Sequence, residues 1–508
     1  MAHIGIIGAG ISGLTLALLL TEKGHSVRVF EASDLPGGAI KTTRNRDGWL
    51  AEWGPNTIIE SSGRIKRLVS MLDLEKRRYY PDSAAKKRYI IRDGKMVAVP
   101  VSLMELVRTP LLSRSAKFSI LREPFRRRAK NHDLHTTDAP ETISSGTDSS
   151  LSRKPGRSEE SLAGFVRRRL GEEFLKWPID ALAGGIYAGD PERLSLRHAF
   201  PRLALLEEQH GSLILGQIKG GVRRPPGSDE IPRNKAEIFS FDDGLQVLPD
   251  TICSRLGDSL SFSSRVAGID MITDPEQGRK INNDDACYTR RWRIHFVNRQ
   301  EPSQEFDKIV YAGTAYGIKS ITLPEKLSDV VAPVADIPHP PVVSLTLGFR
   351  RQDVAHPLDG FGMLIPGVEK FPILGTLFTS TLFPNRAPDD EHVTLTTYLG
   401  GSRQPEIAEK SEDEQIKLVI ASLHKLLGLH GEPLFRHRIL WSRAIPQYEL
   451  GHGRFLSLMD RAEHDHPGFY MAGNYRTGIS VGDTINAAFD LADRIDRDLN
   501  GPASGANR

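Results

Sequence analysis

Three glycines near the N-terminus could hold a phosphate group against the backbone. They are Gly8, Gly10 and Gly13, spaced as G-x-G-x-x-G between an apolar run and a leucine-rich segment. Gly10 lets the backbone approach a pyrophosphate, and the N–H groups at the start of a following helix bind its charge. Glu31 lies eighteen residues after Gly13 and can accept both hydroxyls of an adenosine ribose. The spacing predicts a dinucleotide site, and the acid disfavours a 2′-phosphate.

The elements around these glycines have the lengths of a βαβ unit. Residues 3–7 and 26–30 are short apolar runs that predict buried strands, and residues 14–24 predict the helix between them. This arrangement places the glycine turn at the end of the first strand, where dinucleotides bind in such folds.

A glycine pair further along the chain indicates which dinucleotide binds. Gly37 and Gly38 follow the acid and are succeeded by Ala39, Lys41 and a threonine. This stretch resembles the second glycine signature of the flavin amine oxidase superfamily, in which the pair lies against the diphosphate of FAD. The arginine that usually follows the pair is Ala39 here.

A third glycine-rich stretch lies near the other end of the chain. Residues 473–483 read GNYRTGISVGD, and residues 484–499 predict a helix with one apolar face. N–H donors at a helix start stabilise the charge that a flavin ring gains on reduction. The stretch resembles the C-terminal FAD motif of the same superfamily.

Composition excludes several other classes of protein. The 508 residues are too many for one ordinary domain, and the net charge of +3 does not predict a nucleic-acid-binding protein. Two cysteines exclude a disulfide framework, a four-cysteine zinc site and a cysteine-ligated iron–sulfur cluster. We expect no metal site, no transmembrane helix and no targeting peptide, and therefore a cytoplasmic protein.

The middle of the chain contains polar insertions and one strongly basic segment. We expect residues 129–157 to be disordered, residues 223–236 to form a loop, and Arg167–Arg169 to lie on a helix surface. Residues 86–128 hold twelve basic and three acidic side chains beside an apolar stripe. Residues 100–128 are therefore either an element that lies on an anionic membrane or a solvated face over a second core.

Residues 159–216 carry the most specific resemblance. The stretch GIYAGDPERLS and the HGSL that follows it are similar to the oxygen-dependent protoporphyrinogen oxidase family and its close relative, coproporphyrinogen III oxidase. The segments WGPNT at 53–57, KRYIIRDGK at 87–95 and FDDGLQ at 241–246 also resemble that family. The resemblance covers nearly the whole chain, and residues 300–440 are its least diagnostic part.

The resemblance implies an α/β (α+β) fold with a discontinuous, Rossmann-type FAD-binding domain. That domain would comprise residues 1–85, 223–310 and 436–508, and a mixed-sheet substrate domain would comprise 86–99 and 311–435. A helical, membrane-associated region would fill residues 100–222.

The resemblance also implies site residues. Catalytic or substrate-binding roles would belong to Asn56, Arg88, Gly184 and Gly185, with Arg88 near a propionate and the glycines letting the backbone approach the pyrroles. The residues expected to bind FAD are Gly8, Gly10, Ile11, Ser12, Gly13, Glu31, Ala32, Gly37, Gly38, Ala39, Gly54, Pro55, Asn56, Thr57, Val266, Gly473, Asn474, Gly478, Ile479, Ser480 and Val481.

The implied activity is oxidation of protoporphyrinogen IX to protoporphyrin IX in haem biosynthesis, with three hydride transfers to FAD and O₂ as oxidant. Coproporphyrinogen III remains open as the substrate, and another flavin amine oxidase, a desaturase or a non-catalytic flavoprotein remains a more distant alternative. The expected partners are the porphyrinogen, O₂, an anionic membrane surface, a second copy of the chain and a ferrochelatase that receives the product. No nucleic-acid partner is expected, and the expected location is the cytoplasm or the cytoplasmic face of a membrane.

Overall fold

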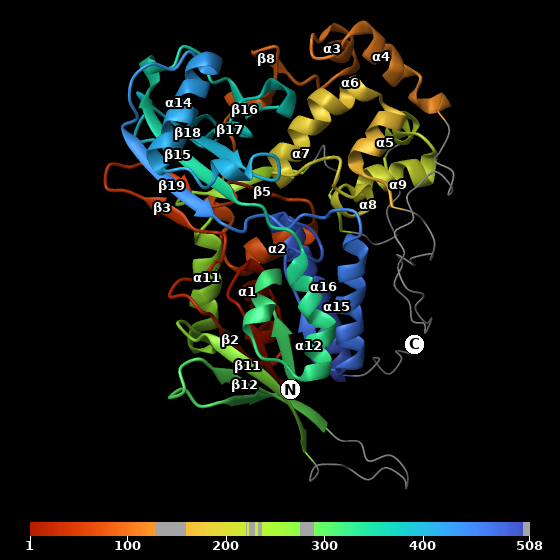
Figure 1. The fold of residues 1–508 in the computed structure, drawn as a ribbon. Helices are drawn as coiled ribbons and strands as arrows, with labels where there is room; N and C mark the ends of the chain where they lie inside the picture. The colour runs from red at the N-terminus through yellow and green to blue at the C-terminus, as the bar shows by residue number, and fades with distance from the viewer. Residues whose placement is uncertain (127–158, 220, 223–228, 232–235, 275–288, 501–508) are drawn as a thin grey trace.

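The computed structural model describes residues 1–126, 159–219, 221–222, 229–231, 236–274 and 289–500. The insertion predicted at 129–157 and most of the loop predicted at 223–236 lie outside the described residues. Figure 1 shows a lower half built on a parallel sheet, and an upper half with a second sheet on one side and a group of helices on the other.

The lower sheet brings together strands from distant parts of the chain. Its order is β10 (Leu260–Ser261), β2 (Ser26–Phe30), β1 (His3–Ile7), β14 (Lys308–Tyr311) and β20 (Phe469–Met471), all parallel. The first two strands in sequence have the predicted bounds, because both are short apolar runs that the sheet buries on both faces.

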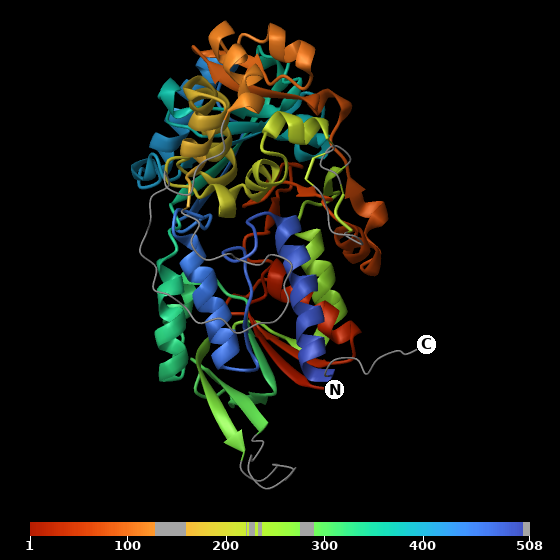
Figure 2. The same cartoon turned by 90° about the vertical axis from the view of Figure 1, so that its right-hand side faces the viewer.

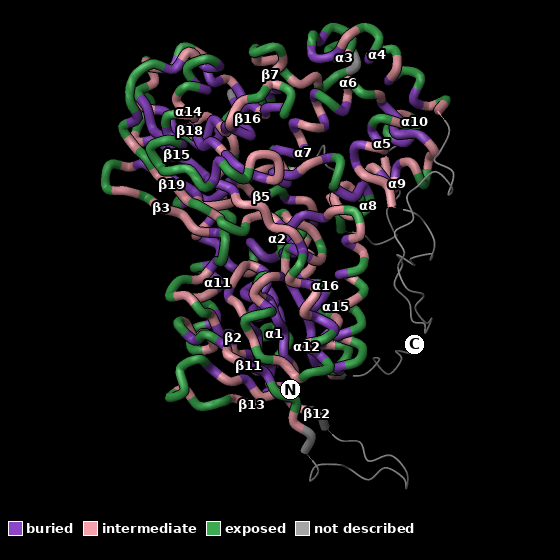
Figure 3. The backbone as a smooth tube through the Cα atoms, in the orientation of Figure 1, coloured by how far each residue is buried: buried purple, intermediate pink, exposed green. Residues whose placement is uncertain are grey.

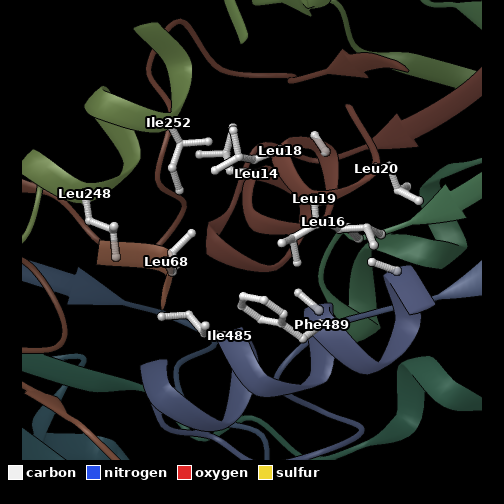
Figure 4. Packing of buried hydrophobic residues seen from close by; sticks show 14 of the residues in the cluster. Leu14, Leu16, Leu18, Leu19, Leu20, Leu68, Leu248, Ile252, Ile485 and Phe489 are labelled. Atoms are coloured by element: carbon white, nitrogen blue, oxygen red, sulfur yellow. The ribbon is translucent and has the colours of Figure 1, made fainter. Parts of the chain in front are cut away.

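Four helices cover one face of this sheet. They are α1 (Ile11–Glu22), α2 (Gly63–Met71), α11 (Val247–Leu256) and α16 (Val481–Asn500). Their apolar side chains interdigitate in one core, in which Leu14, Leu68, Ile252 and Phe489 meet (Figure 4). α16 begins three residues before the predicted start at residue 484.

The other face packs on a three-stranded sheet and a helix pair. The strands are β11 (Val266–Asp274), β12 (Thr289–Phe296) and β13 (Gln304–Phe306), and the helices are α12 (Glu325–Val331) and α15 (His452–Asp465). Figure 2 shows α12 and α15 side by side along one flank. Trp292 is fully buried in this core.

The upper sheet has seven strands and is mixed. Its order is β19 (Phe435–Trp441), β15 (Val342–Arg350), β18 (His392–Gly400), β17 (Gly375–Phe378), β16 (Gly360–Leu364), β7 (Lys87–Arg92) and β8 (Lys95–Ala98). Only the β16–β7 pair is parallel among these described strands. Helix α14 (Glu412–Leu427) covers one face through Ile416, Val419 and Leu423.

The helical group contains α3 (Leu103–Arg108), α4 (Arg114–Leu121), η3 (Glu123–Phe125), α5 (Leu162–Arg169), α6 (Glu172–Phe174), the π-turn η4 (Leu175–Ile179), α7 (Asp180–Tyr187), α8 (Leu196–Ala199), α9 (Pro201–His210) and α10 (Leu213–Ile218). A fully buried ion pair between Glu123 and Arg169 joins η3 to α5. The predicted surface position of Arg169 is therefore wrong, because Glu123 and two backbone carbonyls receive its guanidinium inside the core.

Short elements connect these parts. They are β3 (Thr42–Arg44), β4 (Leu50–Glu52), β5 (Ile58–Ile59), η1 (Glu75–Arg77), β6 (Arg78–Tyr79), η2 (Ser83–Lys86), β9 (Ile238–Phe241), η5 (Gly257–Ser259), η6 (Ala315–Ser320), η7 (Ala332–Asp336), η8 (Arg351–Asp353), η9 (Gly367–Glu369), α13 (Thr379–Leu382), η10 (Pro384–Arg386) and η11 (Pro405–Ile407). Buried residues run through the centre of the lower half around α1 and β2 (Figure 3). Within the described residues, no helix is both long enough and apolar enough to cross a membrane.

Candidate active site

The N-terminal glycine turn has the geometry of a diphosphate cradle. Gly8 has φ 108°, and a Cβ there would lie 2.9 Å from the carbonyl oxygen of Ala312. A Cβ on Gly13 would overlap the carbonyl of Gly8, so helix and turn can pack only with glycine at that position. A Cβ on Gly10 would meet nothing within 4 Å, so the packing of the protein itself does not require glycine there. The open space beside Gly10 fits the close approach of a ligand.

Helix α1 presents its N-terminus to this space. It begins at Ile11 and Ser12, and its N-cap residue Gly10 supplies no side-chain hydrogen bond. The first N–H groups of a helix have no partner within it, so they are available to an anion here.

Glu31 lies at the end of β2, where its carboxylate organises the neighbouring turn. One oxygen accepts the Ala9 N–H at 2.8 Å, and the other accepts both the N–H and the hydroxyl of Ser33 at 2.9 Å. Its backbone carbonyl accepts the Ser264 N–H at 2.8 Å, two residues before Val266 begins β11. Glu31, its neighbour Ala32 and the segment before Val266 therefore lie at one end of the lower sheet.

The second glycine pair packs directly on the first turn. The Gly37 N–H donates to the carbonyl of Ala9 at 2.8 Å, and a Cβ on Gly38 would lie 3.3 Å from the Cα of Gly10. A Cβ on Gly54 would lie 2.7 Å from the carbonyl oxygen of Ala39. The structure thus stacks the glycine turn, the glycine pair and the segment of Gly54, Pro55, Asn56 and Thr57.

Arg476 anchors the C-terminal loop, residues 473–480, to the neighbouring elements. Arg476 forms an ion pair with Glu463 and donates to the carbonyl of Met471 at 2.8 Å. Gly478 has φ 133°, and a Cβ there would lie 2.6 Å from the Cβ of Asp483, so only glycine is unstrained at this bend.

This loop contains Gly473, Asn474, Gly478, Ile479 and Ser480, and leads into α16 at Val481. The start of α16 lies beside the segment that follows Thr57. Asn486 accepts the hydroxyl of Ser62 at 2.6 Å, and a Cβ on Gly482 would lie 3.1 Å from the carbonyl oxygen of Ile59. All three glycine-rich stretches predicted from the sequence therefore meet around one region.

Asn56 joins this region to the upper sheet. Its amide nitrogen donates to the hydroxyl of Tyr398 at 2.7 Å and to the carbonyl of Gly54 at 3.2 Å. Its amide oxygen is buried and has no hydrogen-bond partner in the described residues. An unpaired buried acceptor is unfavourable, so this oxygen fits a ligand that carries a donor.

The glycine pair at 184–185 lies within helix α7. Side chains from other elements pack against both glycines, where a Cβ atom would otherwise be. A Cβ on Gly184 would lie 2.8 Å from a guanidinium nitrogen of Arg403, and a Cβ on Gly185 would overlap Leu364 of β16. Arg403 is paired with Asp180 at 2.9 Å. Gly184 is buried, whereas Gly185 is exposed.

Arg88 lies on β7 beside β16, opposite Gly362. It is exposed, and its guanidinium carbon lies 5.2 Å from the centre of the Phe361 ring. Within the described residues, it forms no hydrogen bond or ion pair with Asn56, Gly184 or Gly185. Strand β16 links Arg88 to the glycine pair: Gly362 pairs with Arg88, and Leu364, two residues later, contacts Gly185.

Several residues at this site were not predicted from the sequence. Tyr398, Arg403 and Leu364 all belong to the stretch without a distinctive motif. Their positions follow from the pairing of β15 to β18 and β7 to β16, which no local pattern reveals. Arg403 follows the glycine pair at 400–401, and this pair was the one available signal of a close backbone approach.

Comparison with known proteins agrees with this geometry. Residues 11–496 match the family model described as flavin containing amine oxidoreductase. The chain is 34% identical to protoporphyrinogen oxidase 2, chloroplastic/mitochondrial, of Arabidopsis thaliana, over 97% of this chain and 93% of that protein. It is 26% identical to coproporphyrinogen III oxidase of Bacillus subtilis (strain 168), over 95% of this chain and 96% of that protein.

A solved structure shares the fold. A protein from Exiguobacterium sp. 255-15, provisionally assigned as a protoporphyrinogen oxidase, superposes with a TM-score of 0.73 at 19% identity, over 97% of this chain and 98% of that one. The predicted α/β fold is confirmed, and with the full-length family match the cofactor is FAD. The chain therefore belongs to the flavin-containing amine oxidoreductase family, as an FAD-dependent member whose relatives include protoporphyrinogen and coproporphyrinogen oxidases.

Proposed function

We propose that this protein oxidises protoporphyrinogen IX to protoporphyrin IX. The observation that carries the proposal is the full-length similarity to the Arabidopsis thaliana protein. The position of exposed Arg88 next to Phe361 of β16 agrees with it. Coproporphyrinogen III is the alternative substrate, because the Bacillus subtilis relative also matches over nearly its whole length.

The domain division that we propose follows the predicted boundaries. Residues 1–85, 223–310 and 436–508 would bind FAD, and residues 86–99 and 311–435 would bind substrate. The two sheets support this division except at two boundaries. Helix α12, within 311–435, packs in the core of the lower half, and strand β19, of which all but Phe435 falls within 436–508, belongs to the upper sheet.

In the proposed FAD site, the turn at Gly8–Gly13 and the pair Gly37–Gly38 hold the diphosphate. Glu31 holds the ribose, and Val266 contacts the adenine through its backbone. The loop at 473–480 and the start of α16 bind the flavin. The open space beside Gly10 and the unpaired oxygen of Asn56 support this assignment.

In the proposed substrate site, Arg88 binds a propionate, and Asn56, Gly184 and Gly185 lie against the macrocycle. Arg88 and Gly185 are exposed, which supports their two roles, whereas Asn56 and Gly184 are buried. Phe361 and Leu364 supply apolar surface to a flat, largely apolar substrate.

When bound, FAD supplies the acceptor for a hydride and passes the electrons to O₂ as H₂O₂. In each cycle a bridging carbon loses hydride and a pyrrole nitrogen loses a proton. Three cycles convert one porphyrinogen and three O₂ into one porphyrin and three H₂O₂. The residues of the chain bind the macrocycle, orient the reacting carbon and exclude water.

The helical group supports the proposal of peripheral attachment to an anionic membrane. Large apolar side chains on and around α3, α4, η3 and α10 are strongly exposed: Val101 (83%), Met104 (61%), Val107 (68%), Phe118 (59%), Leu121 (65%), Phe125 (88%) and Ile218 (76%). We call these seven residues the apolar patch. Arg108 ends α3, Arg114 begins α4 and Arg122 follows α4, and all three are exposed. Exposed apolar and basic side chains together suit a bilayer surface with acidic headgroups.

We further propose a homodimer, delivery of the product to a ferrochelatase, and a location in the cytoplasm or on the cytoplasmic face of a membrane. These proposals rest on the sequence resemblance.

The experiment that tests the proposed substrate is a comparison of protoporphyrinogen IX and coproporphyrinogen III, followed by porphyrin fluorescence. Coproporphyrinogen carries two further propionates that need cations, and Arg403 is already paired with Asp180. We therefore expect a kcat/KM for protoporphyrinogen at least tenfold higher. A preference for coproporphyrinogen would replace the main proposal with the alternative.

A further inference from the structure

One tyrosine outside the predicted site connects the cofactor loop to the helical group. Tyr448 lies between β19 and α15 and is 3% exposed. Its hydroxyl donates to the carbonyl of Asn474 and accepts the N–H of Gly478 at 2.9 Å. The hydroxyl therefore joins two residues on the two sides of the bend, as a donor to Asn474 and as an acceptor from Gly478.

The rest of Tyr448 is fixed by residues outside the loop. Its ring stacks on His452 with centres 4.2 Å apart and an interplanar angle of 23°. Its backbone carbonyl accepts the Ser195 N–H at 2.8 Å, and the Leu450 N–H donates to the carbonyl of Arg193 at 2.9 Å. Residues 448–450 therefore pair with the segment that follows α7.

A carboxylate reinforces this junction. Glu159 accepts the hydroxyl of Ser195 at 2.6 Å and the N–H of Gly451 at 2.5 Å. Ile479 of the cofactor loop packs against the apolar core of the helical group, to which Tyr448 also belongs. Tyr448 is thus held by several contacts outside the loop, and its hydroxyl binds the loop. The bend of that loop at Gly478 has a positive φ, which only glycine adopts without strain.

We infer that Tyr448 is a positioning residue for FAD: its hydroxyl holds the carbonyl of Asn474 and the N–H of Gly478 in the arrangement that the bound flavin requires. A loop that is already ordered loses less conformational freedom on binding, so the cofactor is retained longer. Phenylalanine would keep the ring stack on His452 but would leave the Asn474 carbonyl and the Gly478 N–H without the hydroxyl that joins them. The inference rests on the proposed assignment of residues 473–480 to the flavin.

The test compares Tyr448→Phe with Tyr187→Phe in the full-length holoenzyme. Tyr187 is the matched control: it belongs to the same core, its ring centre lies 6.0 Å from that of Tyr448, and its hydroxyl donates to the carbonyl of Ala199 instead of to the cofactor loop. The rate of FAD release after dilution is measured by flavin fluorescence. We expect release from Tyr448→Phe to be faster by roughly tenfold or more, because removal of one hydroxyl breaks two hydrogen bonds to the cofactor loop. Release from Tyr187→Phe should stay within about twofold of the unmodified protein.

Hydrogen exchange gives a second readout that needs no substitution. In the unmodified holoenzyme the amide of Gly478 should exchange slowly, and in Tyr448→Phe faster exchange should be confined to residues 473–480. Unchanged FAD release from Tyr448→Phe, an equal acceleration in Tyr187→Phe, or rapid exchange of the Gly478 amide in the unmodified protein would each overturn the inference. None of these measurements uses porphyrinogen, so failure here is distinguishable from failure of the proposed substrate.

Discussion

Arg88 is the only cation proposed to bind a propionate of the substrate. Replacing it with alanine removes the cation proposed for a propionate and leaves the β7–β16 pairing intact. We expect KM for protoporphyrinogen to rise about tenfold, with kcat little changed, because a charge-assisted hydrogen bond is lost from binding. Steady-state kinetics of Arg88→Ala, with Arg88→Lys as a partial rescue, measure this effect.

A matched control for Arg88 is Arg436. It is an exposed arginine on β19, at the opposite edge of the same sheet. Arg436→Ala should leave KM unchanged. Equal kinetics for Arg88→Ala and the unmodified protein would remove Arg88 from the substrate site.

Glu52 gives the protein a specific dependence of stability on pH. It is 2% exposed, accepts the Leu245 N–H at 2.9 Å and the Thr42 hydroxyl at 2.6 Å, and lies 3.5 Å from Arg386. Burial raises the pKa of its carboxyl from 4.5 to about 7, although Arg386 opposes the shift. The folded state therefore binds the proton more tightly than the unfolded chain does.

The sign of the pH effect follows from that raised pKa. The contribution of Glu52 is fully present below pH 4.5 and is lost as the pH rises to about 7. A shift of this size corresponds to about 3 kcal/mol in the free energy of unfolding. Glu52→Gln keeps the shape without the charge, so its stability should fall less over this range. Parallel stability curves of the two proteins from pH 4 to pH 8, measured by thermal unfolding, would exclude the raised pKa.

Local sequence was sufficient for some residues and not for others. Gly8, Gly13 and Glu31 were predicted because they belong to one local motif, although the carbonyl that excludes a Cβ on Gly8 belongs to distant Ala312. The reason for Gly184 could not be predicted, since Arg403, which occupies the space beside it, is more than two hundred residues away. Arg169 was placed wrongly for the same reason: its partner Glu123 belongs to a different element.

At the scale of elements, α3 and α4 carry the proposed membrane contact. Phe118 and Phe125 are both strongly exposed members of the apolar patch. Replacing both with serine should lower binding to vesicles of anionic lipid at least tenfold, because each buried aromatic side chain contributes roughly 1.5–3 kcal/mol. Flotation of the full-length protein with such vesicles measures the bound fraction.

A control for the patch tests whether any exposed apolar residue has the same effect. Leu434 precedes β19 and is 52% exposed. Leu434→Ser should bind vesicles as well as the unmodified protein does. The membrane proposal fails if the unmodified protein does not float, or if raised salt leaves its binding unchanged.

Elements with a clear period were predicted within a few residues. β1 and β2 have the expected bounds, and α16 begins at Val481 because Ser480 caps it through the Asp483 N–H at 3.0 Å. The glycine pair at 184–185 gave no helical signal, yet it lies inside α7. Packing against β16 and Arg403 overrides the low helix propensity of glycine there.

At the scale of the molecule, the site exists only where separate stretches of chain meet. The lower sheet unites strands that begin at residues 3, 26, 260, 308 and 469, and the upper sheet adds β7 and β8 to strands from residues 342–441. Motifs at the two ends of the chain predicted the cofactor side of the site. The upper sheet carries Tyr398 and Leu364, and its strand order could not be predicted, because register and order depend on contacts between distant residues.

The most direct test of the central claim is anaerobic mixing of the holoenzyme with protoporphyrinogen IX. We expect the yellow absorbance of the oxidised flavin to disappear, because each flavin can accept one hydride without O₂. Admission of O₂ should restore the absorbance, produce H₂O₂ and let porphyrin fluorescence appear, because one porphyrin requires three cycles. Putrescine serves as the control, and we expect an amine to leave the flavin oxidised. An unchanged flavin absorbance after protoporphyrinogen is added would show that this protein does not oxidise it.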